Sequence, residues 1–318
     1  MFKLEEEVKS PRSGYGQTLV ELGAQNKDIV VLDADLSCST QTCMFAKAFP
    51  DRFFNVGIAE QDLMGTAAGL ATVGKTPFVS TFAMFATARC LDQIRNSICY
   101  PNLNVKIVAT HGGVTVGEDG ASHQALEDIS FMRSIPDIQV IVPADYTEVV
   151  QVIKYAANTS GPMYIRLART NLKTIFDETK YSFNPKTAVK IRDGKDLTIV
   201  TNGETLVEVI DCAKMLEESG IDVEVLHIPV VKPFFALDDL IESVKKTKKV
   251  VTVENHSIIG GLGSAVCEAL SENFPVKALR IGTPDVFGQS GEQRALMEYF
   301  GLTGSKIYEK IKEFLKKA

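Results

Sequence analysis

Carboxylates, histidines and arginines recur in this sequence at the points where short apolar runs end. Asp35 follows the run "DIVVLD", Glu60 follows "FFNV", and Arg169 follows "MYIRL". His111 follows "VKIVAT" and begins the Gly-rich segment "HGGVTVGEDGASHQ", which also holds His123. Carboxylates and imidazoles transfer protons, and guanidinium groups bind phosphates. Gathered at one place, these residues would suit acid–base chemistry on an anionic substrate.

The apolar runs that precede these residues are spaced like the strands of a parallel sheet. The expected strands span 28–33, 53–56, 77–80, 105–110, 138–143 and 163–167, and segments with helical apolar spacing separate most of them. Continuous apolar runs are typical of strands covered by helices on both faces. Ligands of such a doubly wound parallel sheet bind beyond the carboxyl ends of its strands. The sequence therefore predicts a site at that edge.

A second α/β pattern follows a polar stretch. Residues 177–196 are polar and lack periodicity, and we interpret them as a linker. Apolar runs resume at 197–203, 223–228, 249–255 and 276–282, with helical segments between them. The 318 residues suffice for two domains of about 150 residues each. We therefore expect one α/β domain over 1–176 and a smaller α/β domain over 197–318.

Composition and charge exclude several classes of protein. The net charge of −6 offers no general basic surface for nucleic acid, and no apolar run approaches the ~18 residues of a membrane span. The six cysteines show no CxxC, and the acidic N-terminal stretch has no apolar leader core, so we expect reduced thiols in the cytoplasm. The sequence has no dinucleotide-binding glycine motif after its first strand, no P-loop and no nucleophile elbow, and its cysteines and histidines are not spaced like zinc ligands. We therefore expect no metal site in this chain.

Each candidate residue also has a structural interpretation. Glu60 alone would be a helix-start carboxylate, favourable by ~0.3–1 kcal/mol. Phe82 and Phe85, three residues apart, would pack in a core. His227 lies in an apolar run and is expected to be a satisfied core histidine, and His256 is expected in a structural turn. The segment "VGEDGASHQ" is too polar for a core element and too long for a plain turn, which favours a functional loop.

Five segments together resemble the C-terminal half of transketolase, a thiamine-diphosphate enzyme. They are "DADLSCST", "NVGIAEQ", "STFAMF", "THGGVTVGEDGASHQ" and "RLARTNL", in the order and at the intervals of that family. The resemblance covers nearly the whole chain and implies a pyrimidine-binding domain over 1–176 and the family's C-terminal domain over 197–318. It also implies transfer of a two-carbon ketol unit from a ketose phosphate, such as xylulose 5-phosphate, to an aldose phosphate in the pentose phosphate pathway.

The resemblance assigns roles to the residues of the cofactor and the reacting carbon. Glu60 is similar to the carboxylate that hydrogen-bonds the cofactor's aminopyrimidine ring and exchanges a proton through it. Phe85 is similar to the aromatic that stacks on that ring, with Phe82 beside it. Asp35 matches an aspartate near the thiazolium. Two further residues match groups that contact the sugar hydroxyls near the reacting carbon and are expected to be catalytic with Glu60: His123 and Asp119.

A second set resembles the family's phosphate-binding group: Arg12, Ser39, His111 and Arg169. Two positions depart from the family pattern. A tyrosine is common where this chain has Ala88, and an acidic residue commonly follows the histidine where this chain has Gly112. Both departures affect walls of the expected pocket, and fine substrate preference depends on them.

The family's diphosphate-binding domain has no counterpart in the sequence. Its GDG…N signature, which holds Mg²⁺ and the diphosphate, is missing from this chain. The resemblance therefore implies a split transketolase, in which a partner subunit supplies that domain and most ligands of the divalent ion. Because family sites are built across a dimer interface, we expect a heterotetramer.

Three other interpretations stay open at the level of sequence. The beta subunit of a 2-oxo acid dehydrogenase has the same two domains, although the phosphate-binding group and "GEDGASHQ" favour a phosphorylated sugar. A transketolase-like enzyme for a branched or sulfonated ketose shares most of the motifs. A non-catalytic scaffold subunit is the third, and the joint presence of Glu60, Phe85 and His123 disfavours it.

Overall fold

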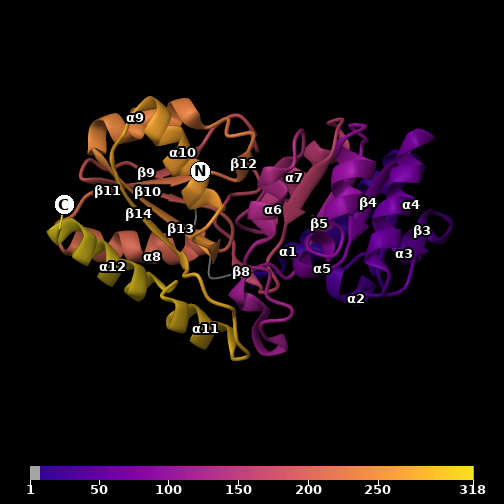
Figure 1. Cartoon of the computed structure of the whole chain (residues 1–318), viewed down its shortest axis with the longest axis horizontal. Coiled ribbons are helices and arrows are strands. Elements are labelled where there is room, and N and C mark those ends of the chain that lie inside the picture. Colours follow the sequence, from indigo (N-terminus) through magenta and orange to yellow (C-terminus); the bar gives the residue numbers. More distant parts are fainter. Residues whose placement is uncertain (1–7, 318) are drawn as a thin grey trace.

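Two α/β lobes lie side by side in the computed structural model, which describes residues 8–317 (Figure 1). Residues 1–7 and 318 lie outside the described part, and so does most of the N-terminal stretch that we interpret as lacking a leader. The first lobe contains a seven-stranded sheet and the second a five-stranded sheet. A further pairing joins β1 (Val8–Lys9) and β8 (Leu172–Lys173).

The first sheet has the strand order β12-β6-β7-β5-β4-β2-β3 and is parallel except for β12, which runs antiparallel to β6. Its strands are β2 (Ile29–Asp33), β3 (Phe53–Asn55), β4 (Thr76–Ser80), β5 (Lys106–Ala109), β6 (Gln139–Ile141), β7 (Met163–Arg166) and β12 (Val230–Lys232). The first six confirm the six strands expected from the apolar runs. The doubly wound parallel sheet is thereby confirmed.

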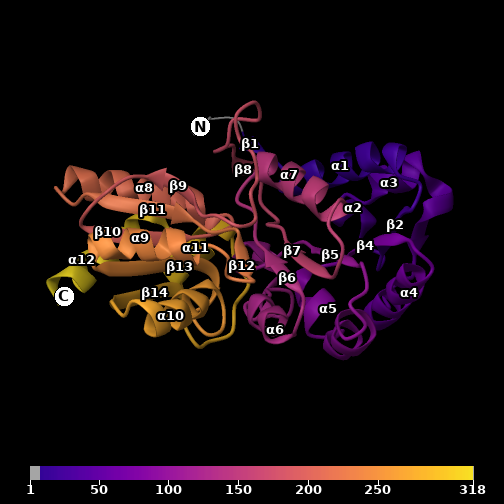
Figure 2. The same ribbon diagram turned by 90° about the horizontal axis from the view of Figure 1, so that it is seen from above.

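Helices cover both faces of this sheet (Figure 2). One face carries α1 (Pro11–Gln25), α3 (Cys43–Ala48) and α7 (Tyr146–Ala157), and the other carries α4 (Glu60–Thr72), α5 (Ala83–Thr87) and α6 (Asp128–Ser134). The connections contain α2 (Ser37–Thr40), the 3-10 turns η1 (Pro50–Arg52) and η3 (Val114–Asp119), and the π-helical turn η2 (Gln93–Cys99). Helix α1 begins where Ser10 accepts the Ser13 amide at 3.2 Å and Pro11 takes the first position.

The second sheet has the order β14-β13-β10-β11-β9. Its strands are β9 (Val189–Arg192), β10 (Leu197–Thr201), β11 (Val223–His227), β13 (Lys249–Ser257) and β14 (Lys277–Thr283). Its helices are α8 (Thr205–Glu218), α9 (Leu237–Thr247), α10 (Leu262–Asn273), α11 (Gln293–Phe300) and α12 (Gly304–Lys316). Helices α9 and α10 lie on one face and α8 and α12 on the other (Figure 1). The four strands expected after residue 197 are present.

Two strands differ from the sequence interpretation. The stretch 177–196, interpreted as a linker, contains β9, which pairs antiparallel with β11 at the edge of the second sheet. Its four residues are too few for a periodic signal, and Arg192 stabilises the pairing through an ion pair with Asp222 at 2.9 Å. Strand β12 belongs to the second half of the chain but extends the first sheet, so its partner β6 lies about 90 residues away. The residues around β12 therefore carry no sequence pattern that identifies β6 as their partner.

The two lobes share buried apolar side chains. The largest buried cluster contains Val140 and Tyr164 of the first sheet together with Leu226, Ile228 and Leu262 of the second lobe. Burial of this apolar surface holds the lobes in one arrangement. Within residues 8–317, the helices are all too short or too polar to cross a membrane.

Candidate active site

The residues singled out in the sequence follow strands of the first sheet at their carboxyl ends. Asp35 follows β2, Glu60 follows β3, Phe82 follows β4, His111 follows β5 and Arg169 follows β7. Strands β2, β3, β4, β5 and β7 are consecutive or neighbouring in one parallel sheet, so their carboxyl ends lie along one edge. The parallel topology therefore brings these segments to the same rim.

An aromatic cluster occupies this rim. The Phe82 ring stacks on the His111 ring with centroids 3.8 Å apart, and the Phe82 and Phe85 rings lie 5.9 Å apart and nearly parallel. The edge of His123 meets Phe85 at 5.1 Å. Phe82 is the N-cap of α5 and Phe85 lies in its first turn, so both rings face the loop that carries His123. Phe82 is 7% exposed, whereas Phe85 is partly exposed.

Glu60 begins α4 beside this cluster. Its side chain is 6% exposed, and the guanidinium Nη1 of Arg89 donates to its Oε1 at 3.0 Å. The Arg89 guanidinium also lies 4.1 Å from the centroid of the Phe85 ring. Arg89 thus connects the buried carboxylate to the exposed aromatic face. The sequence analysis did not single out Arg89. Its one sequence clue was that it directly follows Ala88, a position where this chain differs from the family pattern.

Arginines and histidines gather next to the aromatic cluster. Arg12 donates to the Ser39 carbonyl at 2.7 Å. Burial and the neighbouring charge of Arg169 lower the pKa of the Arg12 guanidinium. Arg169 donates to the Val116 carbonyl and lies 3.5 Å from the exposed Glu118 carboxylate. The fold therefore brings together the four residues of the expected phosphate-binding group, from three different connections and the start of α1.

His111 is electrically neutral in this surrounding. Burial, followed by the charges of Arg12 and Arg169, lowers the pKa of the His111 imidazole to about 3. Its Nδ1 is 2.7 Å from the Thr110 hydroxyl oxygen. The neutral imidazole can therefore donate one hydrogen bond to an anion through its other nitrogen, while the positive charge comes from the two arginines.

His111 should make the stability of the fold sensitive to acid. An unfolded histidine has a pKa of about 6.5, so between about 6.5 and 3 the unfolded chain binds a proton that the folded chain does not. The free energy of unfolding therefore falls as the pH is lowered through this window, by up to ~1.4 kcal/mol per pH unit from this group. His111→Asn suits the positive φ of 62° at this position. Between pH 6.5 and 5, the free energy of unfolding measured with urea should fall by ~1–2 kcal/mol less in the variant than in the parent.

The matched control for that measurement is His123→Asn. His123 is only partly buried, so this variant removes one imidazole of the same rim and leaves the buried position 111 unchanged. Equal loss of stability in the parent and in His111→Asn would contradict the assignment of the acid sensitivity to His111.

The loop after β2 is held by a carboxylate that the sequence analysis did not single out. Asp33 is buried and accepts from the Leu36 amide at 2.6 Å and from the hydroxyls of Thr40 and Thr42 at 2.7 and 2.9 Å. Burial raises the pKa of Asp33. These bonds fix the turn that presents the Ser39 carbonyl to Arg12. The one clue to Asp33 in the sequence was that it is a charged residue at the end of the apolar run 29–32.

Two expected site residues stand apart from these contacts. Asp35 is exposed at a positive φ of 63°, and its Oδ1 accepts from Asn55 Nδ2 at 3.1 Å. Asp119 lies at the exposed end of η3. Within the described part of the chain, the ring contacts and ion pairs that connect the other candidates do not include these two.

Gly112 has a structural explanation. Arg166, inside β7, is buried, and its Nε donates to Asp128 Oδ2 at 2.8 Å. Its Nη2 donates to the Asn255 carbonyl of the second lobe at 2.9 Å. A Cβ atom at position 112 would overlap this guanidinium. Position 112 therefore has no room for a side chain while Arg166 keeps this place.

The second lobe also fixes the loop that carries Arg169. The buried Glu204 carboxylate accepts from Thr170 at 3.2 Å, from Thr115 at 2.8 Å and from Asn255 at 2.5 Å. Burial raises the pKa of Glu204. Thr170 directly follows Arg169, so this network holds the arginine loop against the loop after β5. This network could not be recognised in the sequence, because Glu204 and its partners are far apart along the chain.

The two remaining histidines are buried. His227 is a core histidine, as expected, but its Nδ1 has no hydrogen-bond partner among the described residues, so the expectation that it is fully satisfied is wrong. The sequence places His256 in a turn, whereas it lies inside β13. His227 Nε2 lies 2.8 Å from Glu148 Oε2 in the core. His256 is buried, and its Nδ1 lies 2.7 Å from the Ser257 carbonyl. At the glycine-rich start of α10, the Glu254 carboxylate accepts hydrogen bonds from the Leu262 and Gly263 amides at 2.7 and 2.8 Å. These amides of the helix start are therefore satisfied within the chain.

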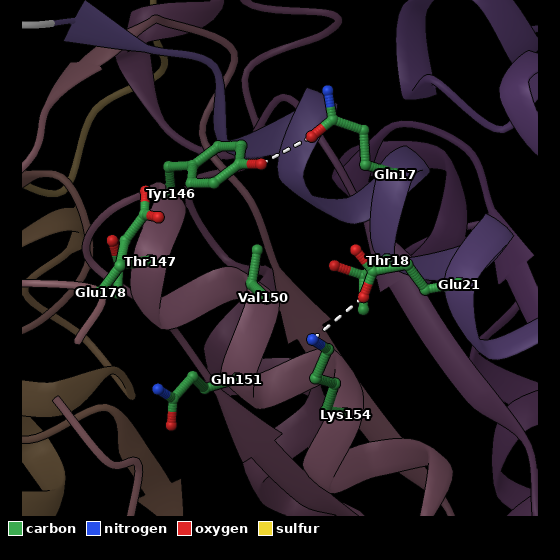
Figure 3. A pocket seen from close by; sticks show the side chains of 9 residues that line it. All are labelled: Gln17, Thr18, Glu21, Tyr146, Thr147, Val150, Gln151, Lys154 and Glu178. Atoms are coloured by element: carbon green, nitrogen blue, oxygen red, sulfur yellow. Dashed lines mark hydrogen bonds and ion pairs between the residues drawn. The ribbon is translucent and has the colours of Figure 1, made fainter. Parts of the chain in front are cut away.

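A surface pocket of about 400 Å³ lies between α1 and α7, away from the aromatic cluster (Figure 3). Two pairs of its polar side chains bond to each other. Tyr146 donates to Gln17 at 2.6 Å, and Lys154 pairs with Glu21 at 3.0 Å. These pairings stabilise the contact of the two helices and leave the rim of the sheet as the candidate site.

Comparison with known proteins matches both lobes to one family. The profile of the transketolase pyrimidine binding domain matches residues 9–174, and that of the transketolase C-terminal domain matches residues 186–307. A protein of Methanocaldococcus jannaschii described as "Putative transketolase C-terminal section" is 51% identical over the full length of both chains. The sulfofructose relative, a 6-deoxy-6-sulfo-D-fructose transketolase subunit of Clostridium sp. MSTE9, is 40% identical and covers 93% of this chain and 91% of its own.

A solved structure gives the same match in three dimensions. A split gene transketolase, described as an inactive beta4 tetramer, superposes with a TM-score of 0.87 at 49% identity and covers 96% of this chain and 98% of its own. The folds therefore agree over both lobes and not only over the pyrimidine-binding domain.

Proposed function

This chain belongs to the transketolase family, and from that premise we propose that it is the C-terminal subunit of a two-subunit, thiamine-diphosphate-dependent transketolase. A partner subunit with the diphosphate-binding domain would complete the site. The reaction would transfer a two-carbon ketol unit from a ketose phosphate, such as xylulose 5-phosphate, to an aldose phosphate.

The observation that carries the proposal is the pairing of two chemically distinct sites on one rim. The first is the buried Glu60 carboxylate beside the Phe85 ring, joined by Arg89 contacts of 3.0 and 4.1 Å. The second is the cationic group of Arg12 and Arg169 around neutral His111. A heteroaromatic ring fits the first, and a sugar phosphate fits the second.

The first site fits the aminopyrimidine part of thiamine diphosphate. A carboxylate can hydrogen-bond a ring nitrogen, and an aromatic face can stack on the ring. The bound cofactor supplies a carbon nucleophile and an electron sink for the ketol unit. Glu60 would hold and move the proton of the ring nitrogen. Phe85 and Phe82 would position the ring and exclude water from it.

The second site would hold and orient the substrate. Arg12, with the Ser39 loop, and Arg169 would bind the phosphate, and His111 would add a neutral hydrogen bond. His123, whose ring centroid lies 5.1 Å from that of Phe85, is proposed to contact substrate hydroxyls near the reacting carbon. Asp119, at the end of the same loop, is proposed to act with it, and Asp35 is proposed to lie near the thiazolium.

The remaining parts of the cofactor need another chain. Among residues 8–317, His, Cys, Asp and Glu form no group of three or more that could hold a metal ion. We propose that the partner subunit holds the diphosphate and Mg²⁺, in a heterotetramer of two copies of each subunit. The relative solved as a beta4 tetramer is described as inactive, which supports dependence on a partner.

Arg169 tests the assigned reaction. Phosphate contacts are equal in the ground and transition states, so their loss appears mainly in KM. In a complex reconstituted with the diphosphate-domain chain, Arg169→Ala should raise KM for xylulose 5-phosphate ~10–100-fold, the range for one lost charge-assisted contact. The value of kcat should change much less, and turnover of unphosphorylated hydroxypyruvate should barely change.

The control for Arg169→Ala is Arg192→Ala, an arginine of similar exposure in the second lobe. Equal impairment of phosphorylated and unphosphorylated donors would show that Arg169 is structural. A reconstituted complex that binds thiamine diphosphate but oxidatively decarboxylates 2-oxo acids, without sugar-phosphate activity, would replace the proposed reaction with that of a 2-oxo acid dehydrogenase.

A sulfonated ketose is the second candidate donor. The observation in its favour is the 40% identity to the sulfofructose relative. The cationic group suits a sulfonate as well as a phosphate, because both are tetrahedral oxyanions. Comparison of kcat/KM for 6-deoxy-6-sulfofructose and xylulose 5-phosphate decides between them.

A further inference from the structure

Arg89 contacts both groups that the proposed cofactor ring would bind, the Glu60 carboxylate and the Phe85 ring. Its guanidinium donates to Glu60 Oε1 at 3.0 Å and lies 4.1 Å from the Phe85 ring centroid. A guanidinium is planar, cationic and able to stack on an aromatic face while donating to a carboxylate. Those are also the properties of a protonated aminopyrimidine ring. The side chain therefore imitates the ring at this site.

The free chain has a physical need for such a group. The Glu60 side chain is 6% exposed, and a buried carboxylate without a partner is costly. Arg89 itself is 50% exposed, so its guanidinium reaches inward from the surface and can return to solvent without crossing the core. Its backbone is anchored independently, since Gln61 Nε2 donates to the Arg89 carbonyl at 2.9 Å. The side chain can move while the helix start stays in place.

We propose that Arg89 is a placeholder for the cofactor: it neutralises Glu60 and covers Phe85 in the cofactor-free subunit, and it is displaced when the aminopyrimidine ring binds. This inference rests on the proposed function. Arg89 then makes two opposite contributions. It stabilises the subunit before assembly, and it weakens cofactor binding because its own contacts are given up first.

The test uses Arg89→Met, which keeps a long apolar stem and removes the charge and the planar group. The cofactor-free variant should unfold at a temperature lower by about 1–2 °C. Arg95→Met is the matched control, because Arg95 is exposed in η2 and, among residues 8–317, its guanidinium donates only to Asn96, at 2.7 Å. The control should unfold like the parent.

The decisive measurement is the Kd of thiamine diphosphate with Mg²⁺, titrated calorimetrically into the complex with the diphosphate-domain chain. Removal of the placeholder should tighten binding by about tenfold, a factor that corresponds to ~1.4 kcal/mol. Arg89→Lys keeps the charge but not the planar face, and should give an intermediate Kd. It also serves as the folded variant if Arg89→Met does not fold.

The outcomes separate this inference from the proposed function. A parent complex that does not bind thiamine diphosphate overturns both. A parent complex that binds it, with variants that bind equally or more weakly, overturns only the placeholder, and weaker binding would make Arg89 a cofactor ligand. Tighter binding by Arg89→Met, together with the lower unfolding temperature of the cofactor-free variant, supports the placeholder.

Discussion

Glu60→Gln should reduce the turnover of the reconstituted complex by about 10²–10⁴-fold, the usual effect of removing a positioned acid–base group. Glutamine has nearly the same shape as glutamate, and its amide oxygen can still accept from Arg89. It cannot exchange a proton with a ring nitrogen. The fold should therefore survive while proton transfer is lost. Steady-state turnover of xylulose 5-phosphate with ribose 5-phosphate, together with circular dichroism, measures the two effects separately.

The control for this prediction lies in the same helical turn. Asp62 is an exposed carboxylate two residues further on, and Asp62→Asn alters the charge at the start of α4 without touching the rim. It should retain nearly full turnover. A Glu60→Gln complex with normal turnover would leave Glu60 with only the structural role of a helix-start carboxylate.

Asp128→Ala should lower the free energy of unfolding by ~3–5 kcal/mol, the cost of breaking a buried ion pair from one side. The change leaves the Arg166 guanidinium, whose side chain is 6% exposed, without its carboxylate. It also removes the acceptor of the Tyr164 hydroxyl, which donates to Asp128 at 2.6 Å. Arg166 joins the two lobes through the Asn255 carbonyl, so the loss should appear in urea unfolding of the whole chain.

Two comparisons make the Asp128 measurement specific. Glu268→Ala breaks a pair with Arg133 in which the glutamate side chain is 63% exposed, and it should cost less than ~1 kcal/mol. The double variant Asp128→Leu/Arg166→Met removes both charges and should recover much of the stability lost in the single variant. An Asp128→Ala variant as stable as Glu268→Ala would show that the buried Asp128–Arg166 pair contributes little to the stability of the chain.

Local sequence carried most of the information about the first lobe. The six apolar runs from 28–33 to 163–167 were recognisable as strands because each is short and continuous, and helical patterns separate most of them. Once the sheet is parallel, the residues after those strands must share an edge, so the common position of Glu60, Phe82 and His111 was predictable. Residue type alone indicated an anionic substrate, whereas the phosphate-binding role of the second set was implied by the resemblance to transketolase.

Contacts between distant segments could not be read in this way. Strand β12 pairs with β6 across about 90 residues, and β9 is too short to show periodicity. The support of the site has the same origin. Arg89 reaches Glu60 across 29 residues, and Glu204 reaches Thr170 across 34. Each is a polar residue whose partner is defined only by packing.

The sequence by itself determined the parallel sheet, the order of its strands along the chain and the chemical types at its carboxyl edge, because periodicity and residue type are local properties. Only the tertiary structure decided which charges are neutralised and which remain for a ligand. It placed Arg89 on Glu60, set Arg166 in the space beside Gly112, and kept His111 neutral between two arginines. These outcomes depend on burial and on distances between segments, and both are set when the two lobes pack together.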